Sequence, residues 1–198
     1  MGLRKVSPGM WLWLALLLVP AAYAASGGRV VHTVDSDRWT DEYDRYFRKY
    51  TKRYFGPGKD WRWFKAQAIA ESALQPEVKS HVGAVGLMQI MPTTFEEIRR
   101  SNPHFRTIDD PRWNIAAGIW YDRRLYRHWT DDLPNLDDRL AYTFASYNAG
   151  LGGVLKAYKR SGTNKVEKNE RSWDRIRPYT PRETRGYVSR IRELMGDD

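Results

Sequence analysis

The apolar residues of this chain recur mostly at helical spacing, and this pattern limits the fold to a class built from packed helices. The clearest case is an aromatic stripe with residues three or four positions apart, at Trp39, Tyr43, Tyr46, Phe47, Tyr50 and Tyr54. Similar spacing predicts further helices over 60–72, 92–101, 112–129, 136–148, 154–160 and 181–195. With little strand pattern and no internal repeat, the chain is expected to be mainly α.

One internal segment does not fit a helix. Residues 77–90 hold Gly83 and Gly86 between short β-prone pieces, which predicts a loop or a small hairpin. The helix before it is expected to end at Ser72 and not to continue past Gln75-Pro76, because the residue before a proline is pushed out of the helical region. The expected class is therefore mainly α, in the α+β sense of a helical domain with a very small β-hairpin region.

The first 24 residues have the layout of a secretory signal peptide. Arg4 and Lys5 precede an apolar block over 10–19, and Ala22-Tyr23-Ala24 is a small-x-small cleavage pattern. The apolar block is shorter than the about 20 apolar residues that a membrane-spanning helix needs. We therefore expect cleavage near Ala25 and a periplasmic location. Membrane association through an uncleaved anchor is the alternative.

The composition limits the kinds of catalysis and the partners that this chain can have. The absence of cysteine excludes disulfides, thiol catalysis and thiolate metal sites, and the four histidines have no spacing of the HExxH kind. We therefore expect no metal site and no cofactor. The formal charge is +9, or +7 without Arg4 and Lys5, when 31 basic and 24 acidic residues remain. An exported basic protein meets anionic polymers such as cell-wall glycans with peptide carboxylates, whereas nucleic acid is not an expected partner.

Glu71 is the only charged residue of the segment "AIAESALQP" at 68–76. Burial among apolar neighbours disfavours the charged form of a carboxyl, so it keeps such a group protonated at a higher pH than usual. That is what a general acid needs near neutral pH. The alternative is a helix-end glutamate that caps or pairs locally, and Glu71 alone does not decide between the two.

The residues after Glu71 resemble the signature of the soluble lytic transglycosylase catalytic domain, E-S-x-x-x-P-x-x-x-S-x-x-G-A-x-G-L-M-Q-I-M-P. Residues 71–92 match every fixed position of it. Three further segments resemble motifs of the same family in the same order: "DDPRWNIAAGIWY" at 109–121, "FASYNAGLGGV" at 144–154 and "RETRGYV" at 182–188. One short motif is weak evidence, but four in order leave little room for chance.

The resemblance covers about residues 58–195. It divides the chain into a signal peptide over 1–24, an N-terminal extension with the aromatic-striped helix over 25–57, and a lytic transglycosylase-like catalytic domain over 58–198. Two features depart from the family's pattern. Ser146 stands where the family usually has alanine, and "IRPYTPRETR" is longer than the usual approach to the last motif.

The resemblance implies a lysozyme-like fold and cleavage of peptidoglycan between N-acetylmuramic acid and N-acetylglucosamine. Most glycosidases use two carboxyl groups, but no second acid stands at a motif position of that kind. In the family the 6-hydroxyl of the muramic acid attacks its own anomeric carbon and leaves a 1,6-anhydro end. Glu71 would then protonate the leaving oxygen and afterwards accept the proton of that hydroxyl.

The resemblance also implies a set of substrate-binding residues around Glu71. Ser80 would hold the N-acetyl group, Tyr147 would orient Glu71 or that group, and Gln89 can both donate to and accept from a sugar amide. The complete set is Ser80, Met88, Gln89, Met91, Tyr147, Asn148 and Glu183.

Several of these residues have a structural alternative. Ser80 suits a turn before Gly83, both methionines suit the core, and Asn148 can simply end a helix. Glu183 and Thr180 form an S/T-x-x-E pattern, so Glu183 can cap the last helix without any role in function.

Two other functions compete with a transglycosylase. A goose-type lysozyme-like hydrolase would share the fold but use water as the acceptor, and a wall-binding scaffold protein would need no catalytic acid. The expected partners are peptidoglycan glycan strands. We expect a monomer, and an envelope protein complex stays open as a further partner.

Overall fold

The computed structural model describes residues 32–197, so the predicted signal peptide lies outside the described residues. Those residues form eight α-helices: α1 (Asp44–Phe55), α2 (Arg62–Ser72), α3 (Pro92–Ser101), α4 (Pro111–His128), α5 (Leu136–Ala149), α6 (Leu151–Arg160), α7 (Trp173–Ile176) and α8 (Arg182–Met195). Short 3₁₀ helices cover Thr163–Lys165, Lys168–Glu170 and Arg177–Tyr179. Over the same range, β structure amounts to bridges of Val85 with Lys79 and Ile90. The mainly α class with a very small β region is confirmed.

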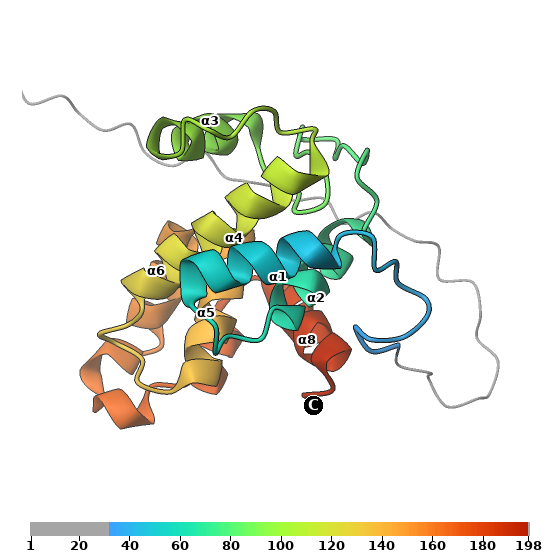
Figure 1. Ribbon diagram of the computed structural model, residues 1–198. Coiled ribbons are helices and arrows are strands. Elements are labelled where there is room, and N and C mark those ends of the chain that lie inside the picture. The colour runs from blue at the N-terminus through green and yellow to red at the C-terminus, as the bar shows by residue number, and fades with distance from the viewer. Residues whose placement is uncertain (1–31, 198) are drawn as a thin grey trace, which may run out of the picture.

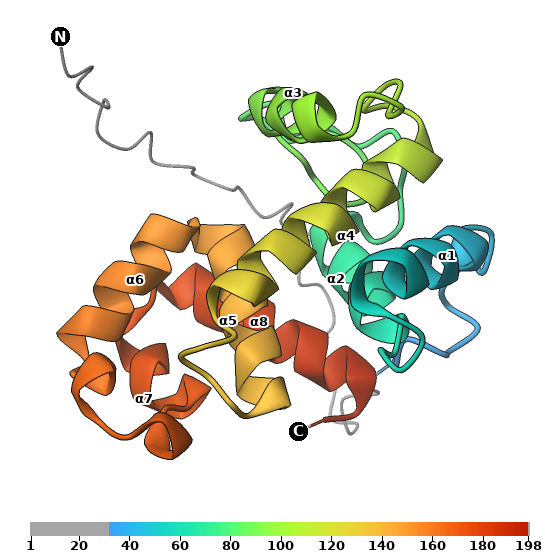
Figure 2. The same ribbon diagram turned by 60° about the vertical axis from the view of Figure 1, so that its left-hand side comes forward.

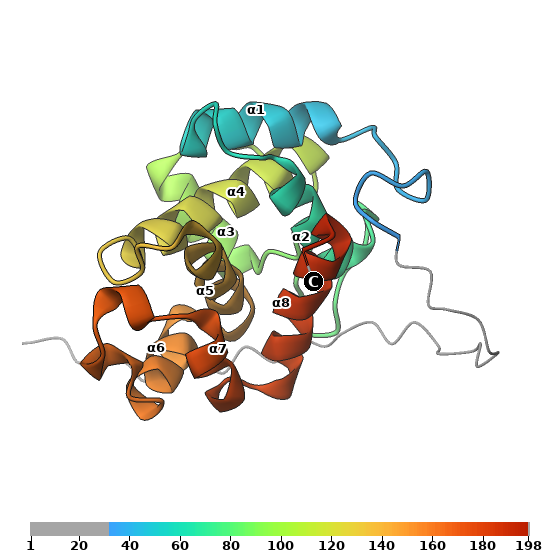
Figure 3. The same ribbon diagram turned by 90° about the horizontal axis from the view of Figure 1, so that it is seen from below.

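Helix α4 is the central element of the fold. It packs against α1 and α5, and α3 lies near its N-terminal half (Figures 1 and 2). Helix α8 packs against both α2 and α5, as the view from below shows (Figure 3). The end of α2, which carries Glu71, therefore lies where segments more than a hundred residues apart in sequence meet.

The core is largely aromatic, as the sequence suggests. Its largest fully buried side chains include Trp129, Tyr50, Tyr142, Phe47, Phe64, Phe105 and Phe144. A buried indole N–H needs an acceptor, and Trp129 Nε1 donates to Ser146 Oγ over 3.0 Å. The serine at position 146, which departs from the family's usual alanine, therefore satisfies the buried indole.

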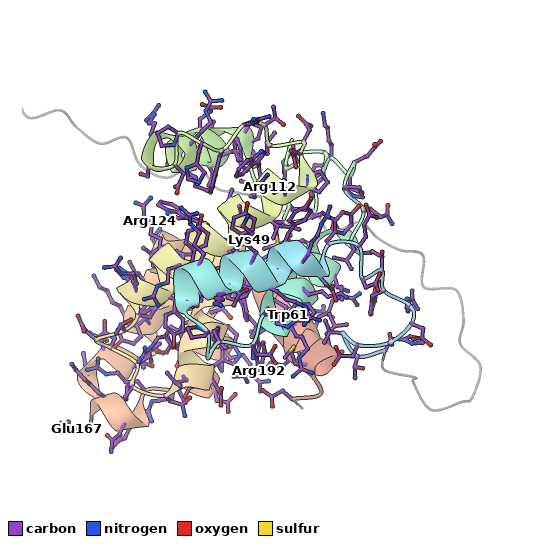
Figure 4. All side chains as sticks on the ribbon, in the orientation of Figure 1. Lys49, Trp61, Arg112, Arg124, Glu167 and Arg192 are labelled. Atoms are coloured by element: carbon purple, nitrogen blue, oxygen red, sulfur yellow. The ribbon has the colours of Figure 1, made fainter. Side chains whose placement is uncertain are left out.

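The described part of segment 25–57 belongs to the same core. Phe47 and Tyr50 of α1 are fully buried, and Arg112 Nε, labelled in Figure 4, donates to the Tyr50 hydroxyl over 3.0 Å. Lys65 of α2 forms a 2.7 Å ion pair with Asp44, and the lysine side chain is only 6% exposed. Helix α1, which belongs to the extension, is therefore packed into the core of the domain.

The predicted start of this first helix was wrong. The aromatic stripe begins at Trp39, but the helix begins at Asp44, because turns occupy the residues before it. These turns close through backbone hydrogen bonds from Trp39 to Ser36 and from Asp44 to Asp41. Apolar residues at helical spacing can therefore face the core from consecutive turns as well as from a helix.

Helix α2 ends at Ser72, as the sequence predicts, and Ala73 (φ 52°) and Leu74 (φ 58°) then take left-handed conformations. Such a conformation costs a non-glycine residue about 1–3 kcal/mol, and two in succession directly follow Glu71-Ser72. Strain of this kind is concentrated at functional sites.

The other differences concern short elements. Helix α6 begins at Leu151 rather than 154, because Gly150 (φ 75°) is the only residue between α5 and α6. Helix α7 and the 3₁₀ turns at 163–179 were not predicted, since segments of three or four residues are too short to show a period.

Candidate active site

The loop over 83–90 is organised by Asn114 of α4. This side chain is 1% exposed and uses its whole amide. Its Oδ1 accepts from the Met88 N–H over 2.8 Å, and its Nδ2 donates to the carbonyl oxygens of Val85 and Ile108, both over 2.9 Å. The loop approaches Asn114 so closely that a Cβ atom on Gly86 would lie 2.6 Å from Asn114 Nδ2. Asn114 therefore fixes the loop beside α2.

Substitution of Asn114 by alanine is expected to destabilise the protein through this loop. Three buried hydrogen bonds would be lost, each typically worth about 0.5–1.5 kcal/mol, so a thermal scan should show a clear drop in melting temperature. Asn102→Ala is the control, because this amide is also buried but bonds the Ile98 carbonyl away from the loop. Asn114→Ala should lose turnover at temperatures where it is still folded, whereas Asn102→Ala should keep it. Equal turnover in both variants would contradict the role of Asn114.

Glu71 lies at the meeting point of α2 and α8. Its Oε1 accepts a hydrogen bond from the Tyr187 hydroxyl over 2.6 Å. Tyr187 is on α8 and is 7% exposed, while Glu71 keeps partial exposure. Ser72, the next residue, donates to the carbonyl oxygens of Ala68 and Leu87, so the end of α2 is attached to the organised loop. Glu71 is thus held in one orientation and remains open to solvent on one side.

Burial raises the pKa of Glu71 to about 8. The hydrogen bond from Tyr187 acts in the opposite direction because it favours the charged carboxylate, and the negative charge of Glu183 adds a smaller upward contribution. A carboxyl with this pKa is protonated at neutral pH and can act as a general acid. The apolar neighbours that the sequence predicts for Glu71 therefore have the expected electrostatic effect.

Two contacts hold the remaining elements in place around Glu71. The Tyr147 hydroxyl of α5 donates to the Met88 carbonyl over 2.7 Å, and Thr184 Oγ1 of α8 donates to Asn148 Oδ1 over 2.8 Å. The charge of Glu71 contributes to raising the pKa of Tyr147, after burial and Asp122, so Tyr147 also lies near the acid. Asn148 is therefore a connection between α5 and α8 rather than a helix terminator.

Asp122 of α4 is a second acid beside the site, and it is fully buried. Its Oδ1 accepts from Gln67 Nε2 over 3.3 Å, while Asp122 Oδ2 and Gln67 Oε1 are buried without a partner. Burial raises the pKa of Asp122 well above its usual value, and the charge of Glu71 raises it further, against the bond from Gln67. A protonated Asp122 has an O–H donor, which is what the Gln67 oxygen lacks.

Asp122→Asn is expected to make stability less dependent on pH. The native pKa of Asp122 lies above the unfolded value, so the native state binds this proton more tightly. The free energy of unfolding should fall as pH rises from about 4 toward the native pKa, and a neutral amide removes that fall. The melting temperature of Asp122→Asn relative to the wild type should therefore increase from pH 4 to pH 8. A difference that stays constant with pH would argue against a protonated Asp122.

The predicted substrate-binding residues of the loop have different surroundings. Ser80 Oγ accepts from the Ala84 N–H over 3.0 Å in a turn, which leaves its own proton free to donate. Met88 is fully buried, and Gly118 of α4 leaves it room, because a Cβ there would lie 2.8 Å from the Met88 side chain. Met91 keeps partial exposure at the start of α3. Ser80 and Met91 are thus accessible, whereas Met88 packs in the core.

Gln89 is occupied within the loop. Its Nε2 donates to the carbonyl oxygens of Val78 and Gly86, over 3.1 and 2.9 Å, and its backbone is left-handed with φ 43°. Both amide protons are therefore used internally. Only the Gln89 carbonyl oxygen is left to interact with a sugar.

Glu183 does not cap α8, so the capping alternative is wrong. The residue before α8 is Pro181, which has no side-chain cap, and the Thr180 hydroxyl donates to the Arg177 carbonyl instead. Glu183 Oε1 is buried without a hydrogen-bond partner, and burial raises the Glu183 pKa. The effect of its charge on Glu71 places Glu183 on the same side of α8 as the site.

Tyr187, Asp122 and Asn114 are functional candidates that the sequence reasoning missed. Tyr187 and Asn114 stand in the segments "RETRGYV" and "DDPRWNIAAGIWY", so the motifs were a signal for both. Asp122 lies outside the motif segments, and the sequence does not distinguish it from any other acidic residue of a helix. Over residues 32–197, no group of three or more His, Cys, Asp or Glu side chains is arranged to hold a metal ion.

Comparison with known proteins agrees with this geometry. The family model described as the Transglycosylase SLT domain matches residues 45–170, so the match begins within α1. The soluble lytic murein transglycosylase of Escherichia coli (strain K12) is 32% identical over an alignment of 175 residues that covers 81% of this chain and 24% of that protein. The membrane-bound lytic murein transglycosylase F of Pseudomonas putida (strain W619) is 32% identical over 141 residues, 71% of this chain and 27% of that protein. The chain thus spans about a quarter of the length of the curated relatives it matches.

Solved structures give the same result. The crystal structure of the 70 kDa soluble lytic transglycosylase from Escherichia coli matches with a TM-score of 0.64 at 30% identity, over 78% of this chain and 24% of that one. A complex of the 70 kDa soluble lytic transglycosylase with bulgecin A matches with a TM-score of 0.62 at 31% identity, over 76% of this chain and 23% of that one. The resemblance and the lysozyme-like fold that it implies are confirmed. Since the family model also covers more than half of the chain, this chain belongs to the Transglycosylase SLT domain family.

Proposed function

We propose that this protein is a peptidoglycan lytic transglycosylase that cleaves the bond between N-acetylmuramic acid and N-acetylglucosamine and leaves a 1,6-anhydro end. The observation that carries the proposal is Glu71, a partly accessible carboxyl whose pKa burial raises to about 8. Relatives named lytic murein transglycosylases support the same activity.

In the proposed mechanism Glu71 acts twice. Protonated Glu71 donates to the leaving glycosidic oxygen and becomes a carboxylate, which the Tyr187 hydroxyl stabilises by its 2.6 Å hydrogen bond. The carboxylate then accepts the proton of the muramic acid 6-hydroxyl as that oxygen bonds to the anomeric carbon. Glu71 ends the cycle protonated, and no water is consumed.

The surroundings of the other acids favour one catalytic carboxyl over two. A glycoside hydrolase needs a second carboxyl that reaches the substrate or its water. Asp122 cannot do so, because it is fully buried behind Gln67. Glu183 is only partly exposed, and its Oε1 is buried without a hydrogen-bond partner. We assign Glu183 to the wall of the site.

We assign substrate positioning to the accessible residues of the loop and to those that support it. Ser80 would donate its free hydroxyl proton to the N-acetyl carbonyl, and Met91 would line the groove. The other predicted residues would keep the loop and α8 in position through the contacts described above. They are Tyr147, Asn148, Met88 and Gln89.

We propose a periplasmic location on the basis of the N-terminal sequence pattern. Among residues 32–197, no helix is long and apolar enough to cross a membrane. Membrane association would then depend on whether residues 1–24 are removed. We also propose that the protein acts as a monomer. An envelope protein complex stays open as a further partner.

Digestion of purified sacculi tests the proposed activity. The released muropeptides are treated with borohydride, which reduces a free reducing end but leaves a 1,6-anhydro end unchanged. We expect products that resist reduction. Reducible muramic acid ends would indicate a lysozyme-like hydrolase, and binding without any release would indicate a wall-binding scaffold.

A further inference from the structure

A basic hollow lies on the outer side of α8. It has a volume of about 530 Å³ and is lined by Arg177, Pro178, Arg182, Arg185, Gly186 and Ser189. Half of the lining residues are arginines and none is acidic. A lining with positive charge and no acidic residue of its own favours an anionic ligand.

The arginines of this hollow are largely available. Within the described part of the chain, the Arg182 side chain has no hydrogen bond or ion pair. Arg177 Nε lies 3.9 Å from Asp174 Oδ1, and both side chains are more than half exposed, so this pair contributes little. Arg185 Nη1 donates to the Pro178 carbonyl over 3.2 Å and thereby braces the wall of the hollow.

The hollow and the candidate active site share one stretch of α8. Arg182 directly precedes Glu183, and Gly186 directly precedes Tyr187, whose hydroxyl bonds Glu71. Successive residues of a helix point about 100° apart, and a helix with its side chains is about 10–12 Å across. The two surfaces are therefore neighbouring faces of the same two turns of α8, separated by about the width of the helix.

We propose that this hollow binds the carboxylates of the peptide stem that the muramic acid carries next to the cleaved bond. The inference rests on the proposed function and extends it to a peptide subsite. In peptidoglycan the peptide is joined to the muramic acid by an amide, so the negative charges are on the peptide and not on the sugar chain. The planar guanidinium fork of arginine matches a carboxylate with two parallel hydrogen bonds, and the open space at Gly186 leaves room for a peptide backbone.

A second hollow provides a matched comparison. It is about 480 Å³ in volume, lies at α3 and is lined by Glu96, Arg99, Arg100, Pro103, Phe105 and Arg106. There Glu96 supplies a carboxylate internally, and Arg99 Nε lies 3.5 Å from its Oε2. The hollow at α3 is therefore similar in size and arginine content but partly neutralised, so the removal of two arginines from it controls for overall charge.

The test compares the binding of the full chain to intact sacculi and to sacculi whose peptide carboxylates have been converted to neutral amides by carbodiimide coupling with ammonia. The double variant Arg177→Gln, Arg182→Gln keeps Arg185 and its bond to Pro178. We expect this variant to bind intact sacculi about tenfold more weakly than the wild type, as the loss of charge-assisted hydrogen bonds predicts. On the amidated sacculi the variant and the wild type should bind equally.

The control is Arg100→Gln, Arg106→Gln, which should bind both kinds of sacculi as the wild type does. Three results would overturn the peptide subsite: no loss in the α8 variant, an equal loss on both kinds of sacculi, or an equal loss in the control. Binding is measured separately from the products. A protein that binds in the expected pattern but releases no anhydro ends would therefore refute the proposed function and keep the subsite.

Discussion

Replacement of Glu71 by glutamine is expected to abolish the formation of 1,6-anhydro products while the protein stays folded. Glutamine keeps the size of the side chain and can still interact with the Tyr187 hydroxyl, but it has no acidic proton to give to the leaving oxygen. General acid–base catalysis is typically worth about 10²- to 10⁴-fold in rate. Product release from sacculi, measured per folded protein, should fall by at least that factor.

The matched control for this substitution is Glu183→Gln. Glu183 is the other partly accessible carboxyl near Glu71, and its amide variant should keep measurable turnover. Wild-type activity should fall as pH rises through about 8, because the protonated acid is lost there. A Glu183→Gln protein as inactive as Glu71→Gln would indicate a hydrolase with two carboxyl groups.

Tyr187→Phe is expected to lower turnover about 10- to 100-fold and to shift its pH dependence. The Tyr187 hydroxyl lowers the pKa of Glu71 by bonding the charged form, so its removal should raise that pKa further. The alkaline limit of activity should move to higher pH, while the maximal rate falls because the carboxylate formed in the first step loses a charge-assisted bond, typically worth about 1.5–3 kcal/mol. The full pH–rate profile measures both effects.

Tyr142→Phe separates this role from a general loss of a buried hydroxyl. Tyr142 is also buried and donates to the Ser172 carbonyl, a backbone oxygen, over 3.1 Å. Its phenylalanine variant should be somewhat less stable but should keep the wild-type pH profile. If Tyr187→Phe also kept the wild-type profile, Tyr187 would be a packing residue only.

The sequence predicts the longer helices well and the irregular segments poorly. Helix α3 has the predicted bounds, and α5 differs by one residue, because Pro92 and Gly150 mark ends that depend on local backbone geometry. The left-handed pair Ala73-Leu74 could not be predicted, since neither residue prefers that conformation. A tertiary contact at this end of α2 is the bond of the Ser72 hydroxyl to the Leu87 carbonyl, which local sequence does not indicate.

In the candidate site, too, the sequence predicts local features and does not predict tertiary contacts. Glu71 could be found from its apolar neighbours and the motif that follows it. Tyr187 lies 116 positions away, and only the packing of α8 against α2 brings its hydroxyl to Glu71. The pairing of Asp122 with Gln67 likewise depends on two different helices. Contacts between different helices follow no recurring spacing in the sequence. The side chains that act through them are therefore identified only in the folded structure.

Digestion of sacculi in ¹⁸O-labelled water, with mass spectrometry of the products, tests the central claim most directly. If Glu71 acts as acid and then as base toward the muramic acid's own 6-hydroxyl, the product lacks one water relative to a hydrolysed muropeptide and contains no ¹⁸O. This is the result that we expect for the wild-type protein. Muramic acid reducing ends that carry ¹⁸O would show that water is the acceptor and would contradict the proposed mechanism.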